Sequence, residues 1–262
     1  MLDVKNLTIR FLDRNGGEAL HGISFHMDEG ECLGIVGESG AGKSLTALGI
    51  AGLLDLKRTI VTGEVIFKGR DLLKVDRSTL HRVQGRDIGF IFQEPVASLN
   101  PLMRIDTQIE ESLVLHTDLT KEQRHEKVIA AMRDVELPDP ERTCRKFPHQ
   151  LSGGQCQRVM IASALICNPP LLIADEPTTA LDVTVQSQII SLLKRVNREQ
   201  GVGVLYISHD LSLVRRLCSR VIVMKDGDIV ESGKTEEIFT KPKKEYTRNL
   251  IAAIPSREKR YV

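Results

Sequence analysis

The sequence predicts an α/β fold, in which a parallel sheet core carries an N-terminal antiparallel β layer and an inserted helical lobe. Three features predict it: apolar residues alternate near the N-terminus, prolines punctuate helix-like segments after residue 93, and strands alternate with helices from residue 171. A chain of 262 residues suffices for one large domain with an added lobe. We expect a single domain over 1–262, with the core and β layer at 1–93 and 169–240, the lobe at 94–168 and a basic tail at 241–262.

The first third of the chain has the pattern of strands around one helix. Residues 2–11 alternate between apolar and polar, and residues 22–37 have the composition of two strands joined by an Asp-Glu-Gly turn. From Lys43 the apolar residues recur at helical spacing, and this repeat closes near Asp55. Further strands are expected within residues 63–69 and 87–93.

Later elements have distinct start and stop signals. Thr120, with Gln123 three residues later, matches a capping box and predicts the start of a helix in the lobe. A helix over residues 183–200 is expected to stop at Gly201. Strands are expected at 171–175 and 202–208, and the Asp226-Gly227 pair predicts a hairpin between two more.

Composition argues against several classes of protein. Basic and acidic residues nearly cancel, 36 against 35, so the concentrated positive charge of a nucleic-acid-binding protein is missing. The five cysteines form no CxxC pair, which argues against a zinc site or a disulfide framework and favours the reduced cytosol. The N-terminus lacks the order of a secretion signal, and the longest uncharged stretch, 159–174, is shorter than the ~20 residues that cross a bilayer. A role at a membrane would therefore need another protein that spans it.

The expected tail is basic. Residues 241–262 carry seven basic side chains against Glu245 and Glu258, a net charge of +5. Such a segment can lie near anionic lipid or remain a solvated tail, and the second is the more common state of a chain end. The basic residues are Lys241, Lys243, Lys244, Arg248, Arg257, Lys259 and Arg260.

The stretch "GESGAGKS" has the spacing of a phosphate-binding loop. It follows the apolar strand "CLGIV" and opens a helix, which is the context such a loop requires and which an ordinary turn does not need. Its glycines let successive backbone N–H groups point inward, Lys43 reaches the β and γ phosphates, and the Ser44 hydroxyl binds Mg²⁺. A nucleoside triphosphate is the predicted ligand, bound by Gly37, Ser39, Gly40, Gly42, Lys43 and Ser44.

Two carboxylates end the apolar strand "LLIADE". Asp175 falls at the carboxyl edge of the predicted sheet, where it can hold the Mg²⁺ shell. Alternation sends Glu176 in a different direction, toward an attacking water, so it is the candidate general base. His209, after the strand "VLYIS", can contact the γ phosphate or orient that water; alternatively it is an ordinary surface histidine.

Gln93 and Phe11 each have a functional and a structural interpretation. Gln93, at the end of the strand "IGFIF", can offer its amide oxygen to Mg²⁺ or to the water, or it can be an unremarkable turn residue. Phe11 can be a platform on which adenine stacks, because it stands where a strand gives way to a polar loop. It can equally pack in the core.

A second glycine-rich stretch, "LSGGQCQR", precedes an apolar helical run. Ser152 and Gln155 match a capping box, which by itself is a structural explanation. Capping does not require the adjacent Gly153 and Gly154, whereas exposed N–H groups at a helix N-terminus suit an anion. This loop lacks the lysine and the Mg²⁺-binding hydroxyl of the first one. Two copies arranged head to tail would resolve this, each lending its incomplete loop to the ATP held by the other.

The order of these motifs resembles that of the ATP-binding cassette (ABC) transporter ATPases over nearly the whole chain, with "LSGGQ" as the family signature. The resemblance implies a P-loop NTPase with a RecA-like parallel core that uses ATP and Mg²⁺. It implies Gln93 as a sensor facing the membrane subunit, Glu176 as base and His209 as a switch. It also implies that Ser152 and Gly154 complete the partner's site and that Asp182 crosses the dimer interface. Cys156 departs from the family, where a charged or larger residue is common.

Three longer segments, "FQEPVASLNP", "DEPTTALDVTVQSQI" and "KKEYTRNLIAAIP", resemble the branch that serves oligopeptide, dipeptide and nickel importers. This implies an ATP-hydrolysing subunit on the cytoplasmic face of the inner membrane, held peripherally by two permease subunits and paired with a second ATPase subunit. An extracytoplasmic binding protein would act indirectly, and no nucleic acid is expected. Peptide-transporting members continue with a cysteine-bearing extension, so the short tail favours nickel or a metal chelate over peptides.

Two other functions remain open. A soluble ABC ATPase of DNA repair or translation usually carries long coiled coils or two cassettes, and neither pattern is present. A small-molecule kinase could use the same phosphate loop, but it would leave "LSGGQ" unexplained.

Overall fold

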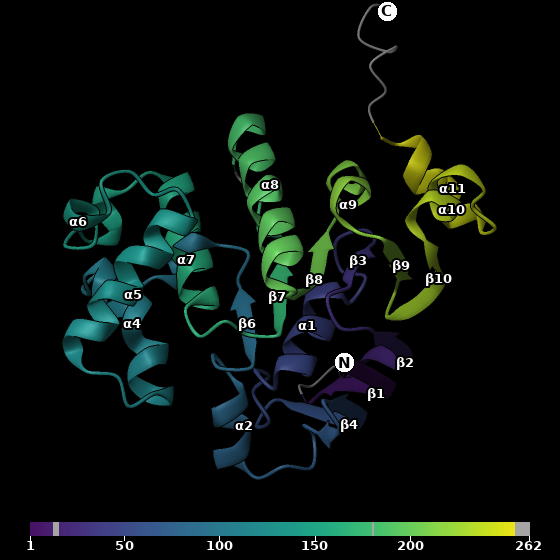
Figure 1. The fold of residues 1–262 in the computed structure, drawn as a ribbon. Helices are drawn as coiled ribbons and strands as arrows, with labels where there is room; N and C mark the ends of the chain where they lie inside the picture. The colour runs from purple at the N-terminus through teal and green to yellow at the C-terminus, as the bar shows by residue number, and fades with distance from the viewer. Residues whose placement is uncertain (13–15, 180, 255–262) are drawn as a thin grey trace, which may run out of the picture. The chain divides into compact units, whose positions relative to one another are not determined.

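The computed structural model describes residues 1–12, 16–179 and 181–254 (Figure 1). The chain divides into two compact units. The first contains Met1–Val75 and Leu205–Val262, and the second contains Asp76–Val204. The second unit is wider than the helical lobe expected over 94–168, because it also takes in two strands and a long helix.

The antiparallel layer lies in the first unit, with the strand order β2-β1-β4-β5. Strand β1 pairs with both β2 and β4, so that Val4 stands opposite Phe25 on one side and Val65 on the other. Val4, Leu7 and Ile9 are fully buried, which places one face of β1 against the core. The strands span Leu2–Phe11 (β1), Glu18–Met27 (β2), Thr59–Phe67 (β4) and Arg70–Asp71 (β5).

The first unit also contains the strands around the phosphate loop. Strand β3 runs parallel to β9, and the order in this part of the sheet is β10-β9-β3-β8. Asp226 and Gly227, with φ values of 47° and 85°, form the expected hairpin turn between β9 and β10. The Gly227 N–H donates to the Ala41 carbonyl at 3.2 Å, and a Cβ on Gly227 would lie 2.6 Å from the Ala19 carbonyl oxygen. These strands span Cys32–Val36 (β3), Gly203–Ser208 (β8), Arg220–Lys225 (β9) and Asp228–Lys234 (β10).

Helix α1 (Lys43–Ala51) ends earlier than the apolar repeat predicts. Gly52 has a left-handed φ of 64°, and its N–H bonds to the carbonyls of Leu48 and Gly49. A glycine in this conformation closes a helix. The extension to Asp55 is therefore wrong, because apolar spacing alone does not separate a capped end from a continuing helix.

The C-terminal elements of the first unit are α9 (Leu211–Leu217), α10 (Thr235–Thr240) and α11 (Glu245–Ala252). Helices α10 and α11 lie beside β10 (Figure 1). Thr247 of α11 is fully buried, so this part of residues 241–262 is packed helix and not the solvated tail expected there. Arg257, Lys259 and Arg260 lie outside the described residues.

The second unit contains most of the helices. Strands β6 (Ile88–Ile91) and β7 (Leu171–Asp175) run parallel to each other. The elements from Pro95 to Leu165 are helical, and α4, α5, α6 and α7 gather together (Figure 1). The helices are α2 (Arg77–Val83), α3 (Pro95–Ser98), α4 (Ile105–His116), α5 (Lys121–Asp134), α6 (Pro140–Thr143), a 3-10 turn at Pro148–Gln150, α7 (Gly153–Leu165) and α8 (Val183–Gln200).

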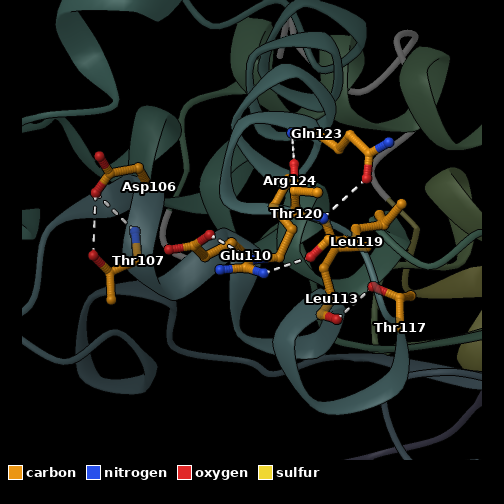
Figure 2. Close-up of polar contacts among 9 residues, drawn as sticks. All are labelled: Asp106, Thr107, Glu110, Leu113, Thr117, Leu119, Thr120, Gln123 and Arg124. Atoms are coloured by element: carbon orange, nitrogen blue, oxygen red, sulfur yellow. Dashed lines mark hydrogen bonds and ion pairs between the residues drawn. The ribbon is translucent and has the colours of Figure 1, made fainter.

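The predicted capping box at the start of α5 is confirmed (Figure 2). The Gln123 N–H donates to the Thr120 hydroxyl at 3.3 Å, and the Thr120 N–H donates to the Gln123 side chain at 2.9 Å. Arg124 then joins α5 to α4, because its guanidinium binds Glu110 at 3.1 Å and the Leu119 carbonyl at 2.7 Å. The turn between α4 and α5 is thus stabilised by the capping box and by the contacts of Arg124.

Helix α8 has the bounds that the sequence predicts, and Gly201 ends it with a φ of 67°. A search of the helices in residues 1–12, 16–179 and 181–254 finds none with the length and apolar character needed to cross a membrane.

Candidate functional site

The phosphate loop connects β3 to α1 in the first unit. A Cβ on Gly37 would lie 2.2 Å from the backbone oxygen of Met224, so no other residue fits there without moving β9. Gly42 has a φ of 95°, a conformation that side chains disfavour, and it stands at the N-cap of α1. The glycine spacing seen in the sequence therefore follows from close backbone approach at Gly37 and left-handed geometry at Gly42.

Lys43 is the basic residue of this loop. Its side chain is buried, and its ammonium group donates to the carbonyls of Gly37 at 3.0 Å and Glu38 at 2.8 Å. Gly42 has no side chain with which to cap α1, so the first-turn N–H groups and the positive end of the helix dipole point at the loop. A buried cation beside a helix N-terminus is suited to a phosphate group. Ser44, the next residue, is half-buried in the first turn.

The second unit holds a carboxylate cluster at the ends of β6 and β7. Strand β7 ends at the buried Asp175, and Glu176 turns away from the strand with a left-handed φ of 46°. The Glu176 carboxylate accepts hydrogen bonds from the Gln93 amide at 3.3 Å and from the Thr179 hydroxyl at 2.9 Å. An unusual φ at a non-glycine residue is typical of functional sites, where it costs about 1–3 kcal/mol.

Two details of this cluster differ from the sequence expectations. Strand β6 ends at Ile91, so Gln93 lies in the loop beyond the strand and is exposed. Thr179 was not a predicted site residue, although its N–H also bonds to the Glu176 carbonyl at 3.1 Å in a turn. The available signal was a hydroxyl residue three positions after a carboxylate, a spacing at which Thr can close such a turn.

The donor set suits Mg²⁺ only if phosphate oxygens complete it. The Asp175 carboxylate and the Gln93 amide oxygen are hard oxygen donors of the kind that Mg²⁺ prefers. In the described part of the chain, no group of three or more His, Cys, Asp or Glu side chains is placed to hold a metal ion. With two such donors, Mg²⁺ would need phosphate oxygens and water to complete its shell, which is how it usually binds.

The signature loop caps α7. The Gln155 N–H donates to the Ser152 hydroxyl at 3.3 Å and the Ser152 N–H donates to the Gln155 side chain at 3.1 Å, so the predicted capping box is confirmed. A Cβ on Gly154 would lie 3.1 Å from the Val185 side chain, a contact tighter than most. A Cβ on Gly153 would have no described atom within 4 Å. Packing in this chain therefore gives no reason for Gly153.

Two neighbours of this loop have structural roles in their own chain. Cys156 is buried in α7, and burial raises the pKa of its thiol, so this departure from the family pattern is not a reactive thiolate. Asp182 caps α8 by accepting hydrogen bonds from the N–H groups of Thr184 and Val185, both at 3.0 Å. Asp182 is exposed, which leaves its second carboxylate oxygen accessible from outside.

The remaining predicted residues lie in the first unit. His209 is exposed directly after β8, and the following Asp210 caps α9 by accepting from the Ser212 N–H at 2.8 Å. Phe11 is the last residue of β1 and stands opposite Thr59. It is half-buried, which is compatible with both interpretations.

Comparisons with known proteins identify the family. A family model described as "ABC transporter" matches residues 20–179. The chain is 44% identical over 260 residues to the oligopeptide transport ATP-binding protein OppD of Bacillus subtilis, covering 98% of this chain and 73% of OppD. It is also 44% identical to the dipeptide transport ATP-binding protein DppD of Haemophilus influenzae, covering 97% of this chain and 78% of DppD.

A solved structure supports the same family. The dimeric post-hydrolysis ATP-binding cassette MJ0796, bound to ADP and Pi, matches with a TM-score of 0.81 and 33% identity, covering 90% of this chain and 99% of that one. The α/β fold predicted from the sequence is thereby confirmed, and a repair or translation ATPase is not favoured. The chain belongs to the ATP-hydrolysing subunits of the ABC transporter family.

Proposed function

We propose that this chain powers the import of short peptides through a separate membrane permease, by binding ATP with Mg²⁺ and hydrolysing it. The observation that carries this proposal is the similarity along nearly the whole chain to transport proteins named for oligopeptides and dipeptides. The preference for nickel or a metal chelate depended only on where the sequence stops, and these relatives do not support it.

The first step is nucleotide binding. The ammonium of Lys43, now donating to two loop carbonyls, would turn to the β and γ phosphates, joined by the loop N–H groups. The oxygens of Ser44, Asp175 and Gln93 would hold Mg²⁺. When bound, this ion neutralises part of the charge on the phosphates. Phe11, half-buried at the end of β1, would stack its ring on adenine.

The second step is hydrolysis, for which Glu176 is the candidate general base. Its carboxylate accepts hydrogen bonds from Gln93 and Thr179, which would orient it toward an attacking water whose proton it accepts. His209 would contact the γ phosphate. Catalysis would consist of orienting the water and stabilising charge, without a covalent intermediate.

The third element is a second ATPase subunit. Gly153 has open space around its Cβ position, at the N-terminus of a helix of 13 residues. We propose that this end of α7, with Ser152, Gly154 and Gln155, binds the nucleotide that the other subunit holds. Asp182, exposed at the start of α8, would lie at the same interface. The partner can be an identical copy or a different chain.

The remaining partners are those that an importer requires. Two permease subunits would hold the chain peripherally at the cytoplasmic face of the inner membrane, and an extracytoplasmic binding protein would deliver the cargo. No nucleic acid is involved.

Reconstitution of the complete complex with its binding protein tests this function. Short peptides should raise the rate of ATP hydrolysis, and an unloaded binding protein is the control. Stimulation by nickel or chelated metals, with no response to peptides, would replace peptide with metal as the cargo. Full hydrolysis by isolated single copies, independent of protein concentration, would contradict the shared site.

A further inference from the structure

One peptide unit of the phosphate loop is held from both ends. The carbonyl of Gly37 accepts a hydrogen bond from the Lys43 ammonium at 3.0 Å. The N–H of Glu38, in the same peptide unit, donates to the hydroxyl oxygen of Tyr246 at 3.2 Å. Tyr246 belongs to α11, in the C-terminal part of the first unit. The C-terminal helix thus reaches Glu38, whose own carbonyl also accepts a hydrogen bond from the Lys43 ammonium.

Helix α11 is anchored before it reaches the loop. The Glu231 carboxylate on β10 accepts the backbone N–H groups of Lys243, at 2.8 Å, and Lys244, at 3.1 Å. These groups stand at the N-terminus of α11, where a carboxylate is stabilising. Thr247, one residue after Tyr246, is fully buried. Tyr246 is therefore presented from a fixed helix and not from a loose chain end.

The ring and hydroxyl of Tyr246 have separate contacts. The Lys225 ammonium lies 5.2 Å from the centre of the ring, a cation–π distance. Burial raises the pKa of the Tyr246 hydroxyl, so it is neutral at physiological pH. A neutral phenol accepts the Glu38 N–H through a lone pair and keeps its own proton. Substitution by Phe would delete the hydroxyl and leave the ring contact.

The peptide group between Gly37 and Glu38 could rotate without the hydrogen bond to Tyr246. Glycine at position 37 gives the backbone more freedom to rotate than any other residue would. A rotation of this peptide would turn the Gly37 carbonyl away from Lys43 and change where the ammonium rests. The Tyr246 hydroxyl opposes that rotation from the N–H end.

We propose that Tyr246 is a positioning residue for nucleotide binding, which fixes the Gly37–Glu38 peptide and through it Lys43. The inference depends on the proposed role of Lys43 as a phosphate ligand. It makes the affinity for ATP depend on the C-terminal helix, because α11 and the phosphate loop share this contact. Loss of one neutral hydrogen bond of this kind corresponds to about a two- to tenfold weaker affinity.

The test is a double-mutant cycle on the full 262-residue chain. Binding of ATP is measured by calorimetry for the wild type, Tyr246→Phe, Lys43→Met and the double variant. Tyr246→Phe should raise the Kd about two- to tenfold in the wild-type background and leave it unchanged beside Lys43→Met. Thr240→Ala is the matched control, because it deletes an exposed hydroxyl whose hydrogen bond stays within α10. It should leave the Kd unchanged.

Thermal unfolding without nucleotide separates positioning from general loosening. The Tm of Tyr246→Phe should stay close to that of the wild type, while its stabilisation by added ATP decreases. An unchanged Kd for Tyr246→Phe, or an equal loss of affinity beside Lys43→Met, would overturn the inference and leave the proposed function intact. A wild-type chain that binds no ATP would overturn both.

Discussion

The side-chain amide of Gln93 donates a hydrogen bond to the carboxylate of Glu176, with 3.3 Å between Nε2 and Oε2. The two residues follow the parallel strands β6 and β7, so the sheet itself brings them together. A residue expected to sense a membrane subunit therefore touches the candidate base directly. Movement of the loop after β6 would change the surroundings of Glu176.

Replacement of Glu176 by Gln tests the proposed base. The amide has nearly the same shape but cannot accept the proton of an attacking water, so turnover should fall by about 10²–10⁴-fold. The Kd for ATP should change little, because Gln keeps an oxygen toward Thr179. Turnover is measured as phosphate release, and the Kd for ATP is measured by calorimetry. Activity above about a tenth of the wild-type rate would exclude Glu176 as the base.

The hydroxyl of Thr179 should contribute to turnover through Glu176. Thr179→Val keeps the branched shape and removes the 2.9 Å hydrogen bond, so that the hydrogen bond from Gln93 remains but the one from Thr179 is lost. We expect kcat to fall about two- to tenfold with little change in the KM for ATP. Thr117→Val is a fair control, because the Thr117 hydroxyl bonds only within its own helix end, to the Leu113 carbonyl. A wild-type kcat for Thr179→Val would show that Gln93 alone suffices.

The two signature glycines should respond differently to Ala. Gly153→Ala meets open space in this chain and favours helix, so the free energy of unfolding should stay the same or rise by up to about 1 kcal/mol. Its ATPase rate should nevertheless fall if a partner's phosphate approaches this position. Gly154→Ala should gain less stability than Gly153→Ala, because its Cβ would lie 3.1 Å from the Val185 side chain, which must move to make room. Urea unfolding and phosphate release measure both effects; full activity of Gly153→Ala would remove the reason for a shared site.

The pair His21 and Asp228 predicts a pH dependence of stability. The hydrogen bond from His21 to Asp228, and then the one to the Glu18 carbonyl, raise the pKa of His21 above 6.5. A raised pKa means that folding favours the protonated form. Its contribution is complete below pH 6.5 and is lost as the pH rises through the folded pKa. Both side chains are exposed, so the change stays below about 1 kcal/mol.

Urea unfolding of wild type and His21→Gln at pH 6 and pH 8 measures this contribution. The difference in unfolding free energy between the two proteins should be larger at pH 6. An equal difference at both values would show that the pair is not charged in the folded protein.

Much of the local structure could be predicted because single residues define it. Asp182 and Gly201 bound α8, the Thr120 capping box starts α5, and Asp226-Gly227 forms the hairpin turn. Each signal lies within a few residues of the structure that it determines. The phosphate loop was predictable for the same reason.

Contacts between distant segments could not be predicted. Tyr246 reaches Glu38 from 208 residues away, and nothing in the local pattern of either segment indicates the other. Gln93 and Glu176 are 83 residues apart and meet only because β6 pairs with β7. The segment after residue 240 has the composition of a tail because charge dominates it. Its packing is instead determined by the burial of Thr247 and by the hydrogen bond that the Glu231 carboxylate on β10 accepts from Lys243.

The hairpin tip at Gly227 has a practical consequence for labelling. A tight Asp-Gly turn at a protein surface is ordinarily a convenient place to insert a fluorophore peptide or an affinity tag. In this chain the Gly227 N–H bonds to Ala41 of the phosphate loop, and a Cβ on Gly227 would lie 2.6 Å from the Ala19 carbonyl oxygen. An insertion there would disturb the grip on ATP, so reporter sequences belong elsewhere on the molecule.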